Sequence, residues 1–115
     1  MKKLTPILIG TLLLGGCTAT DIGIYKGEMV ATWYMHGSRT ANGERFDPNG
    51  MTAAHKKLPF NTRVRITNPE NGNSIVVRIN DRGPFRKGYE FDLARGAARA
   101  ISMRGTSKLE VLVLD

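Results

Sequence analysis

The segment INDRGPF, residues 79–85, places an acidic side chain at the end of an alternating apolar stretch. Asp81 is followed by Arg82, and the chain then turns at Gly83-Pro84. A rigid turn after a strand would fix a carboxyl group at the rim of a groove, where it could transfer a proton. The alternative is a solvated turn aspartate that bonds its own backbone. Adjacent strand residues point to opposite faces, so Arg82 is not expected to pair with Asp81.

Two further side chains could act together with such an acid. His55 ends the apolar stretch MTAAH and could hold a proton, orient a carboxyl or donate to a ligand, unless it is a satisfied core histidine. Glu44, in TANGE, could bind hydroxyl groups or raise the pKa of Asp81 by like-charge repulsion, unless it is a solvated turn residue. His36 is interpreted as a surface loop residue. With two histidines in the chain, we predict no metal site and no other cofactor.

The first 16 residues have the three-part layout of an export signal. Lys2 and Lys3 form a positive head, and residues 4–14 are an apolar run, shorter than the roughly 20 residues that span a bilayer. The segment LLLGGC ends with the single cysteine, Cys17, and resembles the lipobox of bacterial lipoproteins. The resemblance implies cleavage before Cys17 and a lipid anchor there, with Thr18 favouring an outer membrane and a domain facing the periplasm. A free thiol is the alternative.

Net charge narrows the range of partners. The full chain carries 17 Lys and Arg against 10 Asp and Glu, a net charge of +7, and loss of Lys2 and Lys3 leaves +5. A basic domain attracts anionic partners. Export argues against nucleic acid, so we predict cell-wall glycan with carboxylate substituents, or lipid head groups. A monomer is expected.

Short extended segments alternate with turns along the rest of the chain. Residues 17–28 are predicted to form a lipidated tether, and residues 29–115 a single domain. Alternating or β-rich segments predict strands at 29–34, 51–55, 62–67, 74–79, 89–94 and 108–114. Turn residues lie at 40–44, 46–50 and 68–73. A short helix follows the fifth strand. Six strands and one helix in fewer than 100 residues indicate a small closed barrel without sheet edges.

The order of these motifs resembles the rare lipoprotein A (RlpA) family. The resemblance rests on ATWY, TANGERFDPNG, MTAAHKKLPFN, INDRGPF and FDLARGAARAI, in that order, over about residues 30–114. It implies a fold that is mainly β with one short helix, a six-stranded double-psi β-barrel related to expansins. It also implies a lytic transglycosylase that cleaves the MurNAc-GlcNAc bond of peptidoglycan strands, preferring strands without stem peptides. The family's essential aspartate falls at Asp81, and its other site residues fall at His55 and Glu44.

The implied reaction sets a demand on the acid. Breaking a glycosidic bond requires protonation of the leaving oxygen while positive charge builds on the sugar ring. In a lytic transglycosylase the muramic acid's own 6-hydroxyl then closes a 1,6-anhydro ring, so one carboxyl can serve first as acid and then as base. Such a carboxyl must hold its proton near neutral pH, through burial or a nearby like charge. We predict that Asp81 has this role, assisted by His55 and Glu44.

The predicted substrate-binding residues surround these three. They are Trp33, Tyr34, Asn42, Arg82 and Asp92. Trp33 and Tyr34 should point to opposite faces of their strand, so that one packs in the barrel and the other can stack on a sugar. For Asp92, capping of the helix is the simpler interpretation and lining of the groove the alternative. Arg39, Arg63, Arg65 and Arg82 could meet lactyl carboxylates or form a solvated face.

Two departures from the family pattern leave a second function open. Met35 and Asn61 stand where relatives commonly have glycine, and Asn tolerates a positive φ much better than Met. A non-catalytic, expansin-like module that binds glycan or loosens the wall would use the same groove. A purely structural envelope lipoprotein is the third hypothesis.

Overall fold

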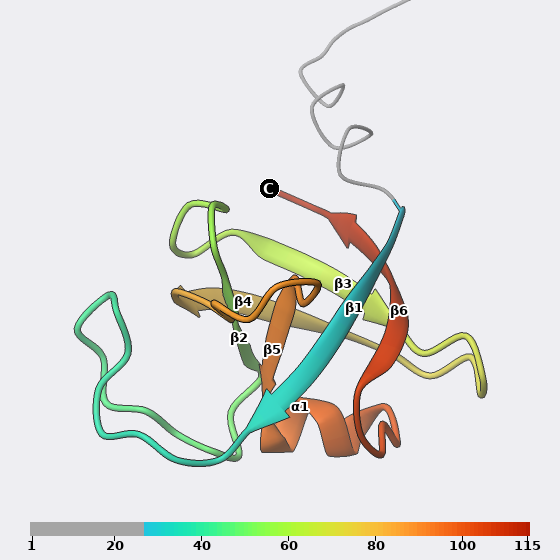
Figure 1. The fold of residues 1–115 in the computed structure, drawn as a ribbon, viewed down its shortest axis with the longest axis horizontal. Coiled ribbons are helices and arrows are strands. Elements are labelled where there is room, and N and C mark those ends of the chain that lie inside the picture. The colour runs from blue at the N-terminus through green and yellow to red at the C-terminus, as the bar shows by residue number, and fades with distance from the viewer. Residues whose placement is uncertain (1–26) are drawn as a thin grey trace, which may run out of the picture.

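A closed barrel of six strands with one short helix forms the part of the chain that the structure describes, residues 27–115 of a computed structural model (Figure 1). Its elements are β1 (Gly27–Tyr34), β2 (Thr52–His55), β3 (Arg63–Thr67), β4 (Ser74–Asp81), β5 (Phe91–Ala94), α1 (Arg95–Ala100) and β6 (Ser107–Val113). The expected export signal and Cys17 lie outside the described residues. No helix within those residues has the length and hydropathy needed to cross a membrane.

Strand pairing closes the barrel in the order β1-β5-β2-β4-β3-β6, with β6 returning to β1. β1 pairs with β5 and β2 with β4 in parallel, whereas the other four neighbours are antiparallel. Every strand therefore has two hydrogen-bonded neighbours, and no edge is left open. The prediction of a small, mainly β closed barrel with one short helix is confirmed.

Alternating apolar residues build the interior of the barrel. Val64 and Ile66 of β3 are fully buried while Arg63 and Arg65 are exposed, as their alternation predicted. The largest fully buried side chains come from several strands and the helix: Phe91, Ile66, Ile79, Leu93, Ile101, Leu109, Val64 and Val77. The helix α1 lies across one end of the barrel (Figure 1) and buries Ala97 and Ala98.

Several element boundaries differ from the predicted ones. β1 begins at Gly27, two residues before the predicted start of the domain, and β5 begins at Phe91 rather than at residue 89. β4 continues through Asp81, so this aspartate is the last strand residue rather than part of the turn. The turn follows at Gly83, which has a φ of +121°. Asn61 has a φ of +72°, the conformation that its replacement of glycine anticipated.

The helix α1 begins without the side-chain cap that was predicted for it. Ala94 occupies the N-cap position and makes no side-chain hydrogen bond, and Asp92 lies two residues earlier, inside β5. Because Asp92 belongs to a paired strand, its side chain projects from the sheet instead of turning back to the helix. Helix capping by Asp92 was therefore a wrong interpretation.

Replacing Gly96 with alanine should destabilise the fold. A Cβ on Gly96 would lie 2.4 Å from the carbonyl oxygen of Asn49, because the backbone of residues 47–50 packs directly on the start of α1. We expect Gly96→Ala to cost about 1–3 kcal/mol, the range for overpacking. At about 4–8 °C per kcal/mol for a domain of this size, a thermal melt would detect the loss.

The matched control for this change is Gly105→Ala. A Cβ at Gly105 meets no atom within 4 Å, so its melting temperature should stay close to that of the unsubstituted protein. Equal melting temperatures for the two variants would contradict the close approach at Gly96.

Candidate active site

Two carboxyl side chains lie on one outer face of the barrel because of the way four strands pair. Thr32 of β1 is paired with Asp92 of β5, Asp92 with Ala54 of β2, and Ala54 with Asp81 of β4. Neighbouring strands are about 4.8 Å apart, so the Cα atoms of the two aspartates are separated by about 10 Å. The small side chain of Ala54 between them leaves space for both carboxyls to share this face.

An irregularity in the pairing of β2 and β4 sets the position of Asp81. Ala53 pairs with Ile79, but the next residue, Ala54, pairs with Asp81, so Asn80 is the extra residue of a bulge. Bulges redirect the side chains that follow them. Without this extra residue, Asn80 would pair with Ala54, and the side chain of Asp81 would point into the barrel.

The carboxylate of Asp81 accepts three hydrogen bonds. The backbone N–H groups of Ala41 and Arg82 donate to Oδ1 at 2.8 and 2.9 Å, and the hydroxyl of Tyr34 donates to Oδ2 at 3.0 Å. These three donors fix the orientation of the carboxyl. The role of Asp81 as the proton-bearing acid stays a prediction.

The guanidinium of Arg82 points away from the Asp81 carboxylate, as the strand geometry predicted. It donates to the carbonyls of Leu58 and His55 at 2.9 and 3.2 Å and lies 4.0 Å from the centre of the Phe60 ring. Arg82 therefore holds the segment after β2 in place. Its predicted contact with substrate finds no support in this arrangement.

Asp92 has a different environment from Asp81. The hydroxyl of Thr32 donates to its Oδ1 at 2.9 Å. Burial raises the pKa of Asp92 above its ordinary value, and the negative charge of Asp81 raises it further, against the opposite effect of the Thr32 hydrogen bond. The surroundings of Asp92 thus favour its neutral acid form.

Tyr34 connects the face to the long loop that follows β1. Its ring stacks on Phe46 with the centroids 4.6 Å apart. Burial, the hydrogen bond to Asp81 and the charges of Asp81 and Asp92 all raise the pKa of Tyr34, so its hydroxyl stays protonated and donates to Asp81. Trp33 makes contacts elsewhere, donating its indole N–H to the carbonyl of Arg104 at 3.4 Å. The two aromatic residues therefore make different contacts, and neither belongs to the core of the barrel, where one of them was expected to pack.

A groove of about 420 Å³ runs beside Asp92. Its lining residues are Thr32, Trp33, Pro84, Arg86, Tyr89, Asp92, Gly105 and Thr106. Sequence analysis selected Trp33 and Asp92 but missed Arg86 and Tyr89. The guanidinium of Arg86 lies 4.9 Å from the centre of the Tyr89 ring. The proximity of both residues to the Gly83-Pro84 turn was the one signal that could have pointed to them.

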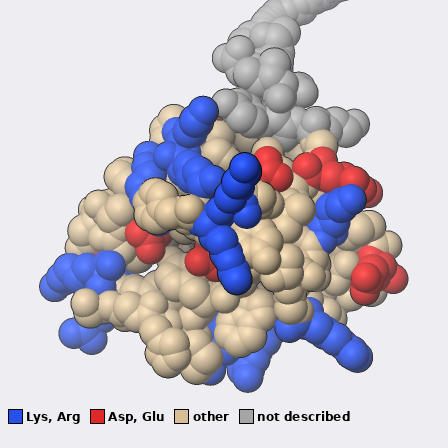
Figure 2. All heavy atoms as spheres, in the orientation of Figure 1, with Lys and Arg blue, Asp and Glu red and all other residues tan. Residues whose placement is uncertain are grey.

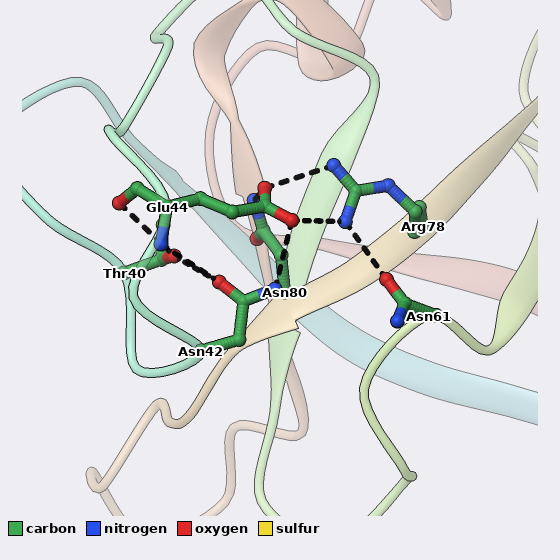
Figure 3. A network of polar contacts seen from close by, with 6 residues as sticks. All are labelled: Thr40, Asn42, Glu44, Asn61, Arg78 and Asn80. Atoms are coloured by element: carbon green, nitrogen blue, oxygen red, sulfur yellow. Dashed lines mark hydrogen bonds and ion pairs between the residues drawn. The ribbon is translucent and has the colours of Figure 1, made fainter.

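Glu44 lies in a network of its own, which fastens the loop after β1 to β4 (Figure 3). Its two carboxylate oxygens accept hydrogen bonds from the guanidinium of Arg78 at 2.7 and 2.9 Å, and from the amides of Asn42 and Asn80. The Arg78 bond, followed by the two amide bonds, lowers the pKa of Glu44 to about 2. Arg78 compensates the charge of Glu44 within this network. Asn42, predicted to bind substrate, donates its amide N–H to Glu44 at 2.9 Å and so orients it.

His55 is held by the backbone of the segment that follows it. Its Nδ1 accepts hydrogen bonds from the N–H groups of Lys57 and Leu58, both at 3.0 Å, and its ring lies 4.9 Å from that of Phe91. Burial lowers the pKa of His55, which favours the neutral ring with its proton on Nε2. His55 can therefore act as a fixed Nε2–H donor, but its strand partner is Phe91, one position away from the pairing of Ala54 with Asp92.

The remaining predicted arginines lie apart from the groove. Arg63 pairs with Asp115 at 2.7 Å, Arg39 donates to the carbonyl of Gly43, and Arg65 is an exposed residue of β3. Figure 2 shows basic side chains on several parts of one face with acidic ones between them, consistent with a net positive charge. Within residues 27–115, no three His, Cys, Asp or Glu side chains are grouped so that they could hold a metal ion.

Acid should weaken the fold partly through Glu44. Its folded pKa of about 2 lies below its ordinary value of 4.5, so its contribution to stability is present above pH 4.5 and is lost as the pH falls toward 2. We expect Glu44→Gln to reduce the free energy of unfolding at neutral pH by about 1 kcal/mol, since the pair is half-exposed. The free energy of unfolding of the variant, measured by urea titration, should also fall less steeply than that of the parent as the pH is lowered from 4.5 toward 2. Glu70→Gln, in the exposed turn between β3 and β4, is the control. The same pH dependence in Glu44→Gln and the parent would contradict the network.

The proton of His55 can be located by NMR. In nitrogen-correlated spectra of the imidazoles at neutral pH, His55 should show a protonated Nε2 and a bare Nδ1. Its titration midpoint should lie below its ordinary value of 6.5, because burial disfavours the charged ring. A His36→Gln variant assigns the signals. A proton on Nδ1 at neutral pH would refute the arrangement.

Comparisons with known proteins agree with this fold. Residues 26–113 match the family model described as lytic transglycolase. The chain is 60% identical over 91 residues to a probable endolytic peptidoglycan transglycosylase RlpA of Synechocystis sp., covering 76% of this chain and 28% of the relative. It is 45% identical over 100 residues to the endolytic peptidoglycan transglycosylase RlpA of Pseudomonas aeruginosa, covering 83% and 29%.

The chain thus spans between a quarter and a third of the length of these relatives. Among solved structures, the Streptomyces papain inhibitor matches with a TM-score of 0.65 and 19% identity, over 78% of this chain and 94% of that one, which supports the double-psi barrel. The family model covers most of the chain, the relatives carry the RlpA name, and the barrel has the predicted form. This chain therefore belongs to the lytic transglycolase family, within its rare lipoprotein A group.

Proposed function

We propose that this chain cleaves peptidoglycan glycan strands between MurNAc and GlcNAc and leaves 1,6-anhydro-MurNAc ends. The observation that carries the proposal is the pair of carboxyls, Asp81 and Asp92, which share one face beside a groove. A non-hydrolytic cleavage needs one acid to protonate the leaving oxygen and negative charge to stabilise the cationic ring. The paired residues Asp92, Ala54 and Asp81 include two carboxyls, which can supply the acid and the negative charge.

The lining of the groove suits an amino sugar with a lactyl carboxylate. Trp33 and Tyr89 offer aromatic surfaces against which sugar rings can pack, and Arg86 can pair with a carboxylate. A stem peptide replaces that carboxylate with an amide, so strands without stem peptides should bind better. The relatives' printed names, endolytic peptidoglycan transglycosylase, support the same reaction class.

The proposed setting is the cell envelope. We infer that Cys17 carries a lipid anchor in the outer membrane and that the barrel faces the periplasm, where the glycan lies. Mass spectrometry of the protein extracted from membranes should find acyl chains on an N-terminal Cys17. An unmodified thiol at this position would remove the anchor from the proposal.

Activity can be tested on defined glycan strands. The full chain carrying Cys17→Ser is incubated with strands stripped of stem peptides, and the products are analysed by mass spectrometry. We expect new 1,6-anhydro-MurNAc ends, and fewer of them from strands that retain their peptides. Binding without new ends would instead support the expansin-like binding module, and neither binding nor cleavage would leave a structural lipoprotein.

A further inference from the structure

We propose that the loop after β1 carries a second binding site, which takes the lactyl carboxylate of a MurNAc further along the glycan strand than the one in the groove. The site is a pocket of about 380 Å³, which we call the loop pocket, and its lining residues are Gly37, Ser38, Arg39, Arg45 and Phe46. The identity of the ligand rests on the proposed function, whereas the site itself rests on the geometry and charge of the loop.

The backbone of this loop holds two arginine side chains on one face. Arg39 and Arg45 are partners in an isolated antiparallel bridge. The residues that flank them exchange backbone hydrogen bonds of 2.9 Å across the loop, while the pair itself exchanges none. Arg39 and Arg45 are therefore a non-hydrogen-bonded pair, in which the Cα atoms are about 4.5 Å apart and the side chains start close together on the same face.

The charges of these two arginines are not compensated by the protein. Like charges directly opposite each other destabilise a strand pair, and within residues 27–115 neither arginine belongs to an ion pair. Glu44, the neighbour of Arg45, is paired with Arg78. Arg39 donates to the carbonyl of Gly43 at 3.1 Å, which orients its guanidinium without neutralising it. An anion in the loop pocket would relieve the repulsion, and a carboxylate matches the geometry of a guanidinium.

The loop pocket is connected directly to the aspartate pair. Phe46, which lines the pocket, stacks on Tyr34 with the ring centroids 4.6 Å apart, and the Tyr34 hydroxyl donates to Asp81 at 3.0 Å. The N–H of Ala41, in the same loop, donates to the other oxygen of Asp81 at 2.8 Å. The loop extends from the barrel to one side (Figure 1, left). A polymer that leaves the aspartates toward this side therefore meets the loop pocket next.

The regular spacing of charge along the substrate gives a second site its use. A strand without stem peptides carries a lactyl carboxylate on every second sugar, so a strand that places one carboxylate near Arg86 in the groove presents others beyond the aspartates. A single exposed charge contact is worth little. Two such contacts on one polymer bind it more tightly than either alone, because the second forms within the complex. A glycan strand, unlike a separate anionic lipid, can occupy the groove and the loop pocket together.

Binding of defined strands to the full Cys17→Ser chain tests the loop pocket. The strands lack stem peptides and contain either one MurNAc or four, and their MurNAc 6-hydroxyls are methylated so that the anhydro ring cannot close and the strands stay intact. A third set consists of the long strands with their lactyl carboxyls converted to methylamides. In calorimetric titrations, Arg45→Gln should weaken binding of the long strands about three- to tenfold. It should bind the short strands and the methylamides as the parent does.

Arg99→Gln is the matched control, because it removes the same charge from an exposed position in the last turn of α1. It should bind every set of strands as the parent does. Without ligand, the melting temperature of Arg45→Gln should equal or exceed that of the parent, since a like-charge contact is lost. A lower melting temperature would indicate a structural role for Arg45 and contradict the uncompensated pair.

The outcomes separate the loop pocket from the proposed function. Anhydro ends, measured on unmethylated strands, decide cleavage, and if none form the cleavage fails while the binding pattern still decides the loop pocket. Unchanged affinity of Arg45→Gln for the long strands overturns the loop pocket, as does an equal loss on the methylamides or in Arg99→Gln. A loss seen only with vesicles that contain phosphatidylglycerol would assign the two arginines to a lipid head group and also overturn the glycan site.

Discussion

The site depends on the register of β2 between its two neighbours. This four-residue strand pairs antiparallel with β5 and parallel with β4, and the pairing puts Asp92, Ala54 and Asp81 in one row. A slip by one residue would turn each affected side chain to the opposite face. The bulge at Asn80 is part of the same constraint, because the extra residue turns the side chain of Asp81 to the outside of the barrel. The closed barrel leaves β2 no free edge along which to slip.

A second constraint ties the loop after β1 to the end of β4. Several contacts hold it there, among them the N–H of Ala41 on Asp81 and the Glu44 carboxylate on Arg78. The two acids that the sequence analysis selected as catalytic therefore also position the loop against β4. Asp92, by contrast, accepts one hydroxyl hydrogen bond and lines the groove.

Local patterns were enough to predict the barrel but not the roles within the site. Alternation identified the strands β3, β4 and β6, and Asn at position 61 anticipated a positive φ, because both signals depend on near neighbours in the chain. The bond from Thr32 to Asp92 joins residues 60 apart, and the Glu44–Arg78 pair joins residues 34 apart. Periodicity carries no information on such distant contacts. Asp92 consequently resembled a helix cap, and Glu44 a partner of Asp81.

The barrel by itself does not decide what the protein does. A protein named a papain inhibitor has the same fold at 19% identity, so the strand order is compatible with functions other than glycan cleavage. Side chains that the barrel does not require are therefore what favours an enzyme. A module that only binds glycan needs aromatic and basic groups in a groove, and has no need of two partly buried carboxyls on one face. Partial removal of such a pair from water costs stability, and this cost is explained if one of the two must hold a proton next to the sugar.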